Sequence, residues 1–127
     1  IDLYVLSYEG DSWEPWDEAQ LLVNSSGAEE LPVWSPDGES IAYVKNADIY
    51  KIEAGGETPQ KLTDTSSIEK HPTWSPDSEE IAFISDKSGN YEIYIMEADG
   101  SDTKEDWDQV TTNQSPHEIS WSPKLTE

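Results

Sequence analysis

Residues 31–44 read LPVWSPDGESIAYV, and residues 71–84 read HPTWSPDSEEIAFI. A third, shorter copy of the same pattern follows at residues 117–123, HEISWSP. Each copy is anchored by a tryptophan, and the anchors lie 40 and 47 positions apart: Trp34, Trp74 and Trp121. Self-similarity at a period of this length indicates an architecture in which each repeat forms one unit of supersecondary structure.

Two further elements recur between the tryptophan anchors. The first is DLYVL at 2–6, DIYKI at 48–52 and EIYIM at 92–96, and its tyrosines lie 46 and 44 positions apart: Tyr4, Tyr50 and Tyr94. The second closes each unit as AQLLVN at 19–24, PQKLTD at 59–64 and DQVTTN at 108–113. Independent sets of anchors therefore agree on a period in the forties, which chance does not explain. Recurrence at a structural period predicts that the repeated Trp and Tyr residues pack between units.

Each unit contains four short β-type runs. The first run ends in a turn whose residues suit that role, Pro36-Asp37-Gly38 in one copy and Pro76-Asp77-Ser78 in the next. The apolar run Ile41–Val44 and the alternating run Asp48–Glu53 predict the second and third strands. Four strands in about 40–45 residues are typical of a β-propeller blade. No stretch shows a sustained helical period, so the sequence predicts an all-β fold.

The combination of these motifs resembles the TolB-like (WD40-like) β-propeller repeat. The resemblance rests on the WSPDG turn, the Ile-Ala-Phe/Tyr strand, the Asp-Ile-Tyr strand and the closing Leu-Thr strand, and it covers almost the whole chain. Two positions depart from the pattern, because Ser78 replaces the turn glycine and Lys124 replaces the turn aspartate. The resemblance implies antiparallel four-stranded blades and a binding or assembly role in the periplasm, on the cell surface or outside the cell.

The repeats predict one propeller region over residues 1–127. We expect a partial blade at 1–30, blades at 31–64 and 71–112, and a partial first strand at 117–123. This is slightly under three blades, whereas a closed propeller typically has about 4–8. The ring is therefore expected to be completed by missing sequence or by self-association, for example two chains giving six blades. The start at Ile1 without Met favours a processed product or an excised piece.

The composition excludes several classes of partner. The chain carries 28 Asp and Glu against 7 Lys, for a formal net charge of −21, so nucleic acid and anionic membrane surfaces would be repelled. High salt would screen this self-repulsion. There is no cysteine, which excludes disulfides and thiol catalysis. No apolar run approaches the roughly 18 residues that a membrane span needs.

Three tryptophans lie outside the repeat pattern, in acidic insertions between third and fourth strands: Trp13, Trp16 and Trp107. Loops carry function more often than the scaffold does, so these residues are candidates for contact with a protein partner or a sugar ring. The alternative is that Trp16 and Trp107, which both precede Asp, cap the edges of their own blades.

Other candidate sites are weaker. His71 and His117, with Glu118, could approach a metal ion, but two His residues do not specify a site. The loop Ser85–Asn90 lacks the calcium-loop spacing and fits a turn. No cofactor is therefore predicted beyond weak calcium or sodium binding by the acidic surface. Asn24 and Asn113 match the N-glycosylation acceptor pattern.

No catalytic motif is present: the sequence has no Gly-x-Ser-x-Gly elbow, no His-Glu-x-x-His and no Gly-rich phosphate loop. The sequence therefore favours a non-enzymatic module that binds a protein partner or its own copies, outside the cytoplasm. Two alternatives remain, a propeller that filters access to a larger peptidase or hydrolase, and a glycan-binding propeller.

Overall fold

The computed structural model describes residues 3–5, 20–23, 29–54 and 58–122. These residues form ten β-strands and no helix, which confirms the all-β prediction. None of the described residues belongs to a helix that could cross a membrane.

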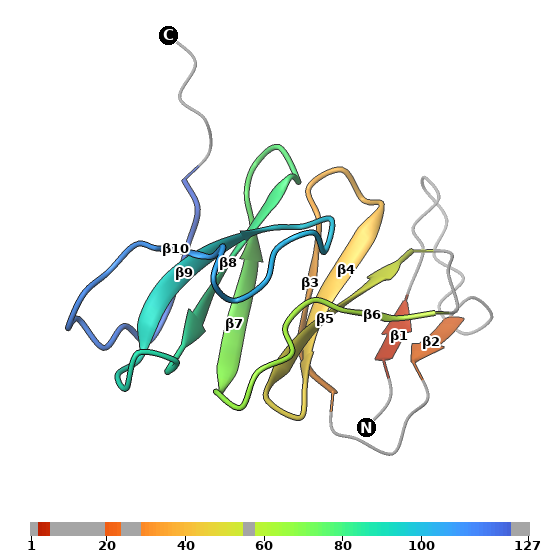
Figure 1. Cartoon of the computed structure of the whole chain (residues 1–127). Coiled ribbons are helices and arrows are strands. Elements are labelled where there is room, and N and C mark those ends of the chain that lie inside the picture. The colour runs from red at the N-terminus through yellow and green to blue at the C-terminus, as the bar shows by residue number, and fades with distance from the viewer. Residues whose placement is uncertain (1–2, 6–19, 24–28, 55–57, 123–127) are drawn as a thin grey trace, which may run out of the picture.

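Eight of the strands form two four-stranded antiparallel sheets (Figure 1). The first sheet holds, in spatial order, β3 (Glu29–Trp34), β4 (Ser40–Lys45), β5 (Asp48–Glu53) and β6 (Gln60–Lys61). The second holds β7 (Glu69–Trp74), β8 (Glu80–Ser85), β9 (Glu92–Glu97) and β10 (Asp108–Gln109). A separate antiparallel pair joins β1 (Leu3–Val5) to β2 (Gln20–Val23). Spatial order follows chain order in both sheets, as in propeller blades.

The WSPD turn is built in the same way in both sheets. The Ser35 hydroxyl donates to the Asp37 carboxylate at 2.5 Å and accepts the Ser40 backbone N–H at 3.0 Å. Ser75 and Asp77 repeat the serine–aspartate bond at 2.5 Å. The turn needs one residue in the left-handed backbone conformation, and Gly38 has φ +75° there. Its counterpart Ser78 adopts φ +64° although a side chain disfavours this conformation.

A threonine closes the outer edge of each blade. The fourth strands β6 and β10 are only two residues long, and a side chain extends their pairing. The Thr63 hydroxyl accepts the buried Ile49 N–H at 2.8 Å and lies 3.4 Å from the Asp48 carboxylate. Thr111 makes the equivalent bonds to the Ile93 N–H and the Glu92 carboxylate.

The two blades pack face against face through one hydrophobic cluster. The first blade contributes small and branched side chains, and the second contributes aromatic and long ones: Ala42, Val44, Ile49 and Leu62 against Trp74, Ile81, Phe83, Tyr94 and Met96. The Trp74 indole N–H also donates to the Val33 carbonyl at 2.9 Å. The first strands β3 and β7 therefore lie against each other, as they do around a propeller axis.

The segment predicted as a further first strand differs from the prediction. Residues 118–122 form no strand, because no described strand bonds to them along their length. Trp121 nevertheless donates its indole N–H to the Thr73 carbonyl at 3.3 Å. This bond repeats the Trp74–Val33 bond one blade further on, so the segment occupies a first-strand position without strand pairing.

A buried carboxylate lies where the chain passes from the first blade to the second. Glu69 is fully buried, and one of its carboxylate oxygens is without a hydrogen-bond partner in the described structure. The other oxygen accepts from the Thr65 hydroxyl. Burial is the main cause that raises the pKa of Glu69 to about 7, and repulsion from Asp48 and Asp86 adds to it.

We predict that Thr63→Val lowers the free energy of unfolding by about 1–3 kcal/mol, because the buried Ile49 N–H loses its acceptor. Urea unfolding followed by circular dichroism measures this change. Thr63→Ser keeps the hydroxyl and should recover most of the stability. Equal losses in the two variants would contradict a role for the hydroxyl.

We also predict that Glu69 makes the fold less stable as pH rises. Its pKa is raised in the folded state, so its contribution is fully present below pH about 4.5 and is lost as pH rises through about 7, by up to about 3 kcal/mol. The measurement is the difference in unfolding free energy between wild type and Glu69→Gln at pH 5 and pH 8. Glu79→Gln, at an exposed carboxylate, is the matched control. A wild-type pH slope retained in Glu69→Gln would refute the assignment.

Candidate functional site

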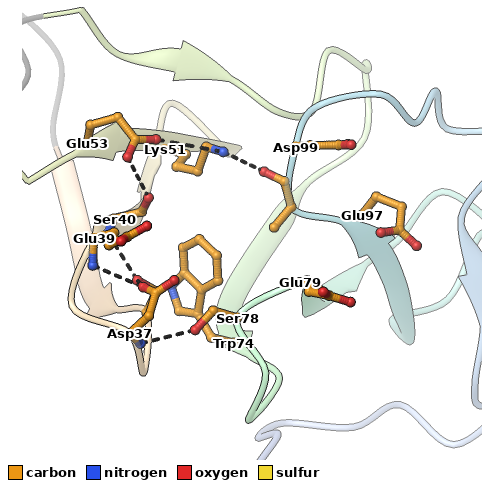
Figure 2. Close-up of a pocket in the computed structure, with 12 residues that line it drawn as sticks. Asp37, Glu39, Ser40, Lys51, Glu53, Trp74, Ser78, Glu79, Glu97 and Asp99 are labelled. Carbon is orange, nitrogen blue, oxygen red and sulfur yellow. Dashed lines mark hydrogen bonds and ion pairs between the residues drawn. The ribbon is translucent and has the colours of Figure 1, made fainter.

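A cleft of about 410 Å³ opens between the two blades, at the end where the WSPD turns lie. The turn after β3 and the end of β5 form one wall, and the turn before β8 and the end of β9 form the other (Figure 2). Trp74 lies between the two walls, with its indole N–H already bound to Val33. The blade interface thus supplies the floor of the cleft, and the turns supply its rim.

The rim is strongly acidic. The described residues lining the cleft include six carboxylates and one ammonium group: Asp37, Glu39, Glu53, Glu79, Glu97 and Asp99, with Lys51. Lys51 is mostly buried and donates from Nζ to the Ala98 carbonyl at 2.7 Å, 3.9 Å from the Glu53 carboxylate. The single lysine therefore joins the two walls and leaves most of the negative charge uncompensated.

The carboxylates of the rim differ in the direction in which their pKa values are shifted. Hydrogen bonds from Ser35 and from the Glu39 backbone lower the pKa of Asp37, and hydrogen bonding from Ser101 lowers the pKa of Asp99. Partial desolvation, followed by repulsion from neighbouring carboxylates, raises the pKa of Glu97. A cation entering the cleft would relieve this repulsion at Glu97. The arrangement suits recognition of positive charge.

A cross-blade hydrogen bond holds the two turns together at the mouth of the cleft. The Asp37 N–H donates to the Ser78 hydroxyl at 3.1 Å (Figure 2). Ser78 is the residue that departs from the glycine of the repeat, and its hydroxyl makes a bond that glycine could not make. No local sequence pattern indicates that Ser78 belongs to a site, because its partner lies 41 positions away.

The structure places Trp107 in the core. Its side chain is 6% exposed, and its ring meets Phe83 edge-on at 4.8 Å between centroids. A ring this buried offers little surface to a partner, so packing within its own blade is the interpretation that the structure supports. The other two candidates, Trp13 and Trp16, lie outside the described residues.

The repeated aromatic residues do not all pack alike. Trp74 is 6% exposed and Tyr94 is 1% exposed, as predicted for packing residues. Trp34 is 45% exposed, and Tyr50 and Trp121 are half-buried. The side chain of Tyr4 lies outside the described residues. The turn residues at the equivalent positions are exposed: Pro36, Pro76, Asp37 and Asp77.

Only some of the residues considered for a metal site come together. His71 and Glu118 line a hollow of about 330 Å³ beside β3 and β7, but His117 is not part of the described lining. No group of three or more potential metal ligands occurs in the described ranges.

Of the two residues that match the N-glycosylation pattern, Asn113 is exposed and lies 3.4 Å from the Asn90 amide, whereas Asn24 falls outside the described residues.

Comparison with known proteins gives a consistent result. The TolB beta propeller domain matches residues 16–125. A solved protein assigned as TolB in Agrobacterium tumefaciens is 27% identical, with a TM-score of 0.61 over 75% of this chain and 34% of its own. TolB from Acinetobacter baumannii is 25% identical, with a TM-score of 0.65 over 80% of this chain and 25% of its own. No curated protein matches the chain.

The chain thus spans about a third and a quarter of these two structures. The family match, in contrast, extends over most of its length and includes both complete blades and all three tryptophan anchors. From the repeated turns, the four-stranded sheets and this match, we conclude that the chain belongs to the TolB β-propeller family.

Proposed function

We propose that this propeller region is a non-catalytic module that binds a basic segment of a protein partner in the acidic cleft between its blades. The observation that carries the proposal is the excess of six carboxylates over one lysine around Trp74. Lys51 keeps its positive charge while it donates to the Ala98 carbonyl, but the carboxylates around the cleft outnumber it six to one.

The shape of the cleft supports a peptide segment as its ligand. Its volume of about 410 Å³ accommodates one or two long side chains, and its walls come from two blades that are fixed by a common core. Loops placed by a rigid scaffold are where propellers and other β-folds carry binding residues. A lysine or arginine side chain could place its apolar stem in the cleft and present its charge to the carboxylates of the rim.

We place the module in the periplasm, on the cell surface or outside the cell. Membership of the TolB β-propeller family supports this location, as does the match to two solved proteins assigned as TolB. The high negative charge supports a soluble surface that avoids nucleic acid and anionic lipids.

The test is calorimetric titration with a lysine- and arginine-rich peptide at low and high salt. We expect binding that weakens as salt rises, because the rim is solvent-exposed. The triple variant Glu39→Gln, Glu79→Gln and Glu97→Gln should bind about tenfold more weakly, since three exposed charges are removed from the rim.

The matched control removes the same number of charges away from the cleft: Asp64→Asn, Glu105→Gln and Asp108→Asn. This control should bind nearly as tightly as the wild type. If both triple variants weaken binding equally, the attraction belongs to the whole surface and the cleft is not the site. Absence of binding at low salt would also overturn the proposal.

A further inference from the structure

The turn that follows β9, Ala98–Gly100, forms part of two hollows. Ala98 and Asp99 line the acidic cleft, on the wall that also carries Glu97. Gly100 lines another hollow, of about 380 Å³, together with residues between 61 and 65 of the first blade and residues between 102 and 107. The position of this turn therefore helps to set how far apart the two walls of the acidic cleft lie.

Two side chains of the first blade hold the backbone of this turn. Lys51, on β5, donates from Nζ to the Ala98 carbonyl at 2.7 Å, across the cleft from one wall to the other (Figure 2). Gln60, at the start of β6, donates from Nε2 to the next carbonyl along the chain, that of Asp99, at 3.3 Å. Two successive carbonyls of one wall are thus bonded to the opposite blade, over 47 and 39 positions of sequence.

Gly100 leaves the space that the Gln60 amide occupies. A Cβ atom at position 100 would lie 2.0 Å from Gln60 Nε2, closer than non-bonded atoms approach. The φ of Gly100 is +82°, which also disfavours any residue with a side chain. Gly38 and Gly89 have positive φ as well, but a Cβ atom at either position would meet no atom within 4 Å. Of these three described glycines, Gly100 is the one at which a side chain would displace a neighbour.

We propose that Gln60 and Gly100 are positioning residues of the acidic cleft, an inference that rests on the proposed binding of a basic segment. The Gln60 amide fits where Gly100 lacks a side chain, and together with Lys51 it holds the wall that carries Asp99. A wall that is fixed in advance lowers the ordering cost of binding, because its backbone does not have to be immobilised when the ligand arrives. Releasing the turn therefore weakens binding without changing the charge of the cleft.

The test is the calorimetric titration with the lysine- and arginine-rich peptide, applied to two charge-neutral variants. Gly100→Ala should bind about three- to tenfold more weakly, because its methyl group displaces the Gln60 amide. Gln60→Ala should weaken binding to a similar extent, because the Asp99 carbonyl loses its donor. Gly89→Ala is the matched control, since it introduces the same kind of backbone strain but meets no neighbour and does not line the cleft. It should bind like the wild type.

A double variant separates positioning from backbone strain. In the Gln60→Ala background, the nearest remaining atom to a Cβ at position 100 would be Leu62 Cδ2, at an ordinary contact distance of 3.5 Å. Adding Gly100→Ala should therefore weaken binding little further, whereas two independent effects would add in free energy. The dependence of affinity on salt concentration should be the same in all variants, because none removes a charge.

The outcomes distinguish this inference from the proposed function. A wild type that does not bind the peptide at low salt removes both. A wild type that binds, with Gly100→Ala and Gln60→Ala binding as tightly as Gly89→Ala, overturns the positioning role alone, and so does an equal loss in Gly89→Ala. Circular dichroism confirms that each variant is folded at the titration temperature. If Gly100→Ala does not fold, Gln60→Ala decides the result, because the Gln60 side chain lies on the exposed surface of β6.

Discussion

The packing of one blade face on the next is the interaction on which the rest of this structure depends. A four-stranded sheet has two faces, and here each blade has apolar side chains on both, as Ile41 and Tyr43 on one side of β4 and Ala42 and Val44 on the other show. Neither face can remain in water without losing the burial that stabilises the sheet. The hydrogen bond from the Trp74 indole to the Val33 carbonyl makes this packing specific, because it positions β7 beside β3.

The acidic cleft is a consequence of this packing. Fixing β7 against β3 brings the two WSPD turns to the same rim, so carboxylates that serve each turn separately become neighbours across the gap. Asp37 illustrates both roles, since it accepts the Ser35 hydroxyl within its own turn and its N–H reaches Ser78 in the next. Charge that stabilises a turn locally is thereby concentrated where a ligand could meet it. The scaffold and the candidate site use the same residues for different reasons.

The blades could be predicted from the sequence because they depend on local patterns that repeat. The tryptophan period, the turn residues and the alternating Asp-Ile-Tyr strand each specify a strand or a turn without reference to distant residues.

The candidate site could not be predicted in the same way. Lys51 meets Ala98 across 47 positions, and nothing in the local sequence indicates that pairing. Trp34 and Trp74 have nearly identical sequence contexts but very different exposure, because exposure depends on what covers a blade and not on the blade itself. Trp107 lay in an acidic loop that suggested a surface role, yet packing against Phe83 determines its position.

Charge and apolar surface act at different ranges in this chain. Repulsion between chains of net charge −21 extends over about a Debye length, roughly 10 Å at 0.1 M salt, whereas burial of an apolar face acts only at contact. Exposed apolar side chains such as Trp34 and Val110 favour non-specific contacts when two chains meet. The long-range repulsion opposes every encounter, and only a contact that buries enough complementary surface can offset it. The same acidic composition leaves the cleft between the blades with more carboxylates than ammonium groups. The acidic cleft thus follows from the charge of the composition together with a fold that places the two turns at one rim.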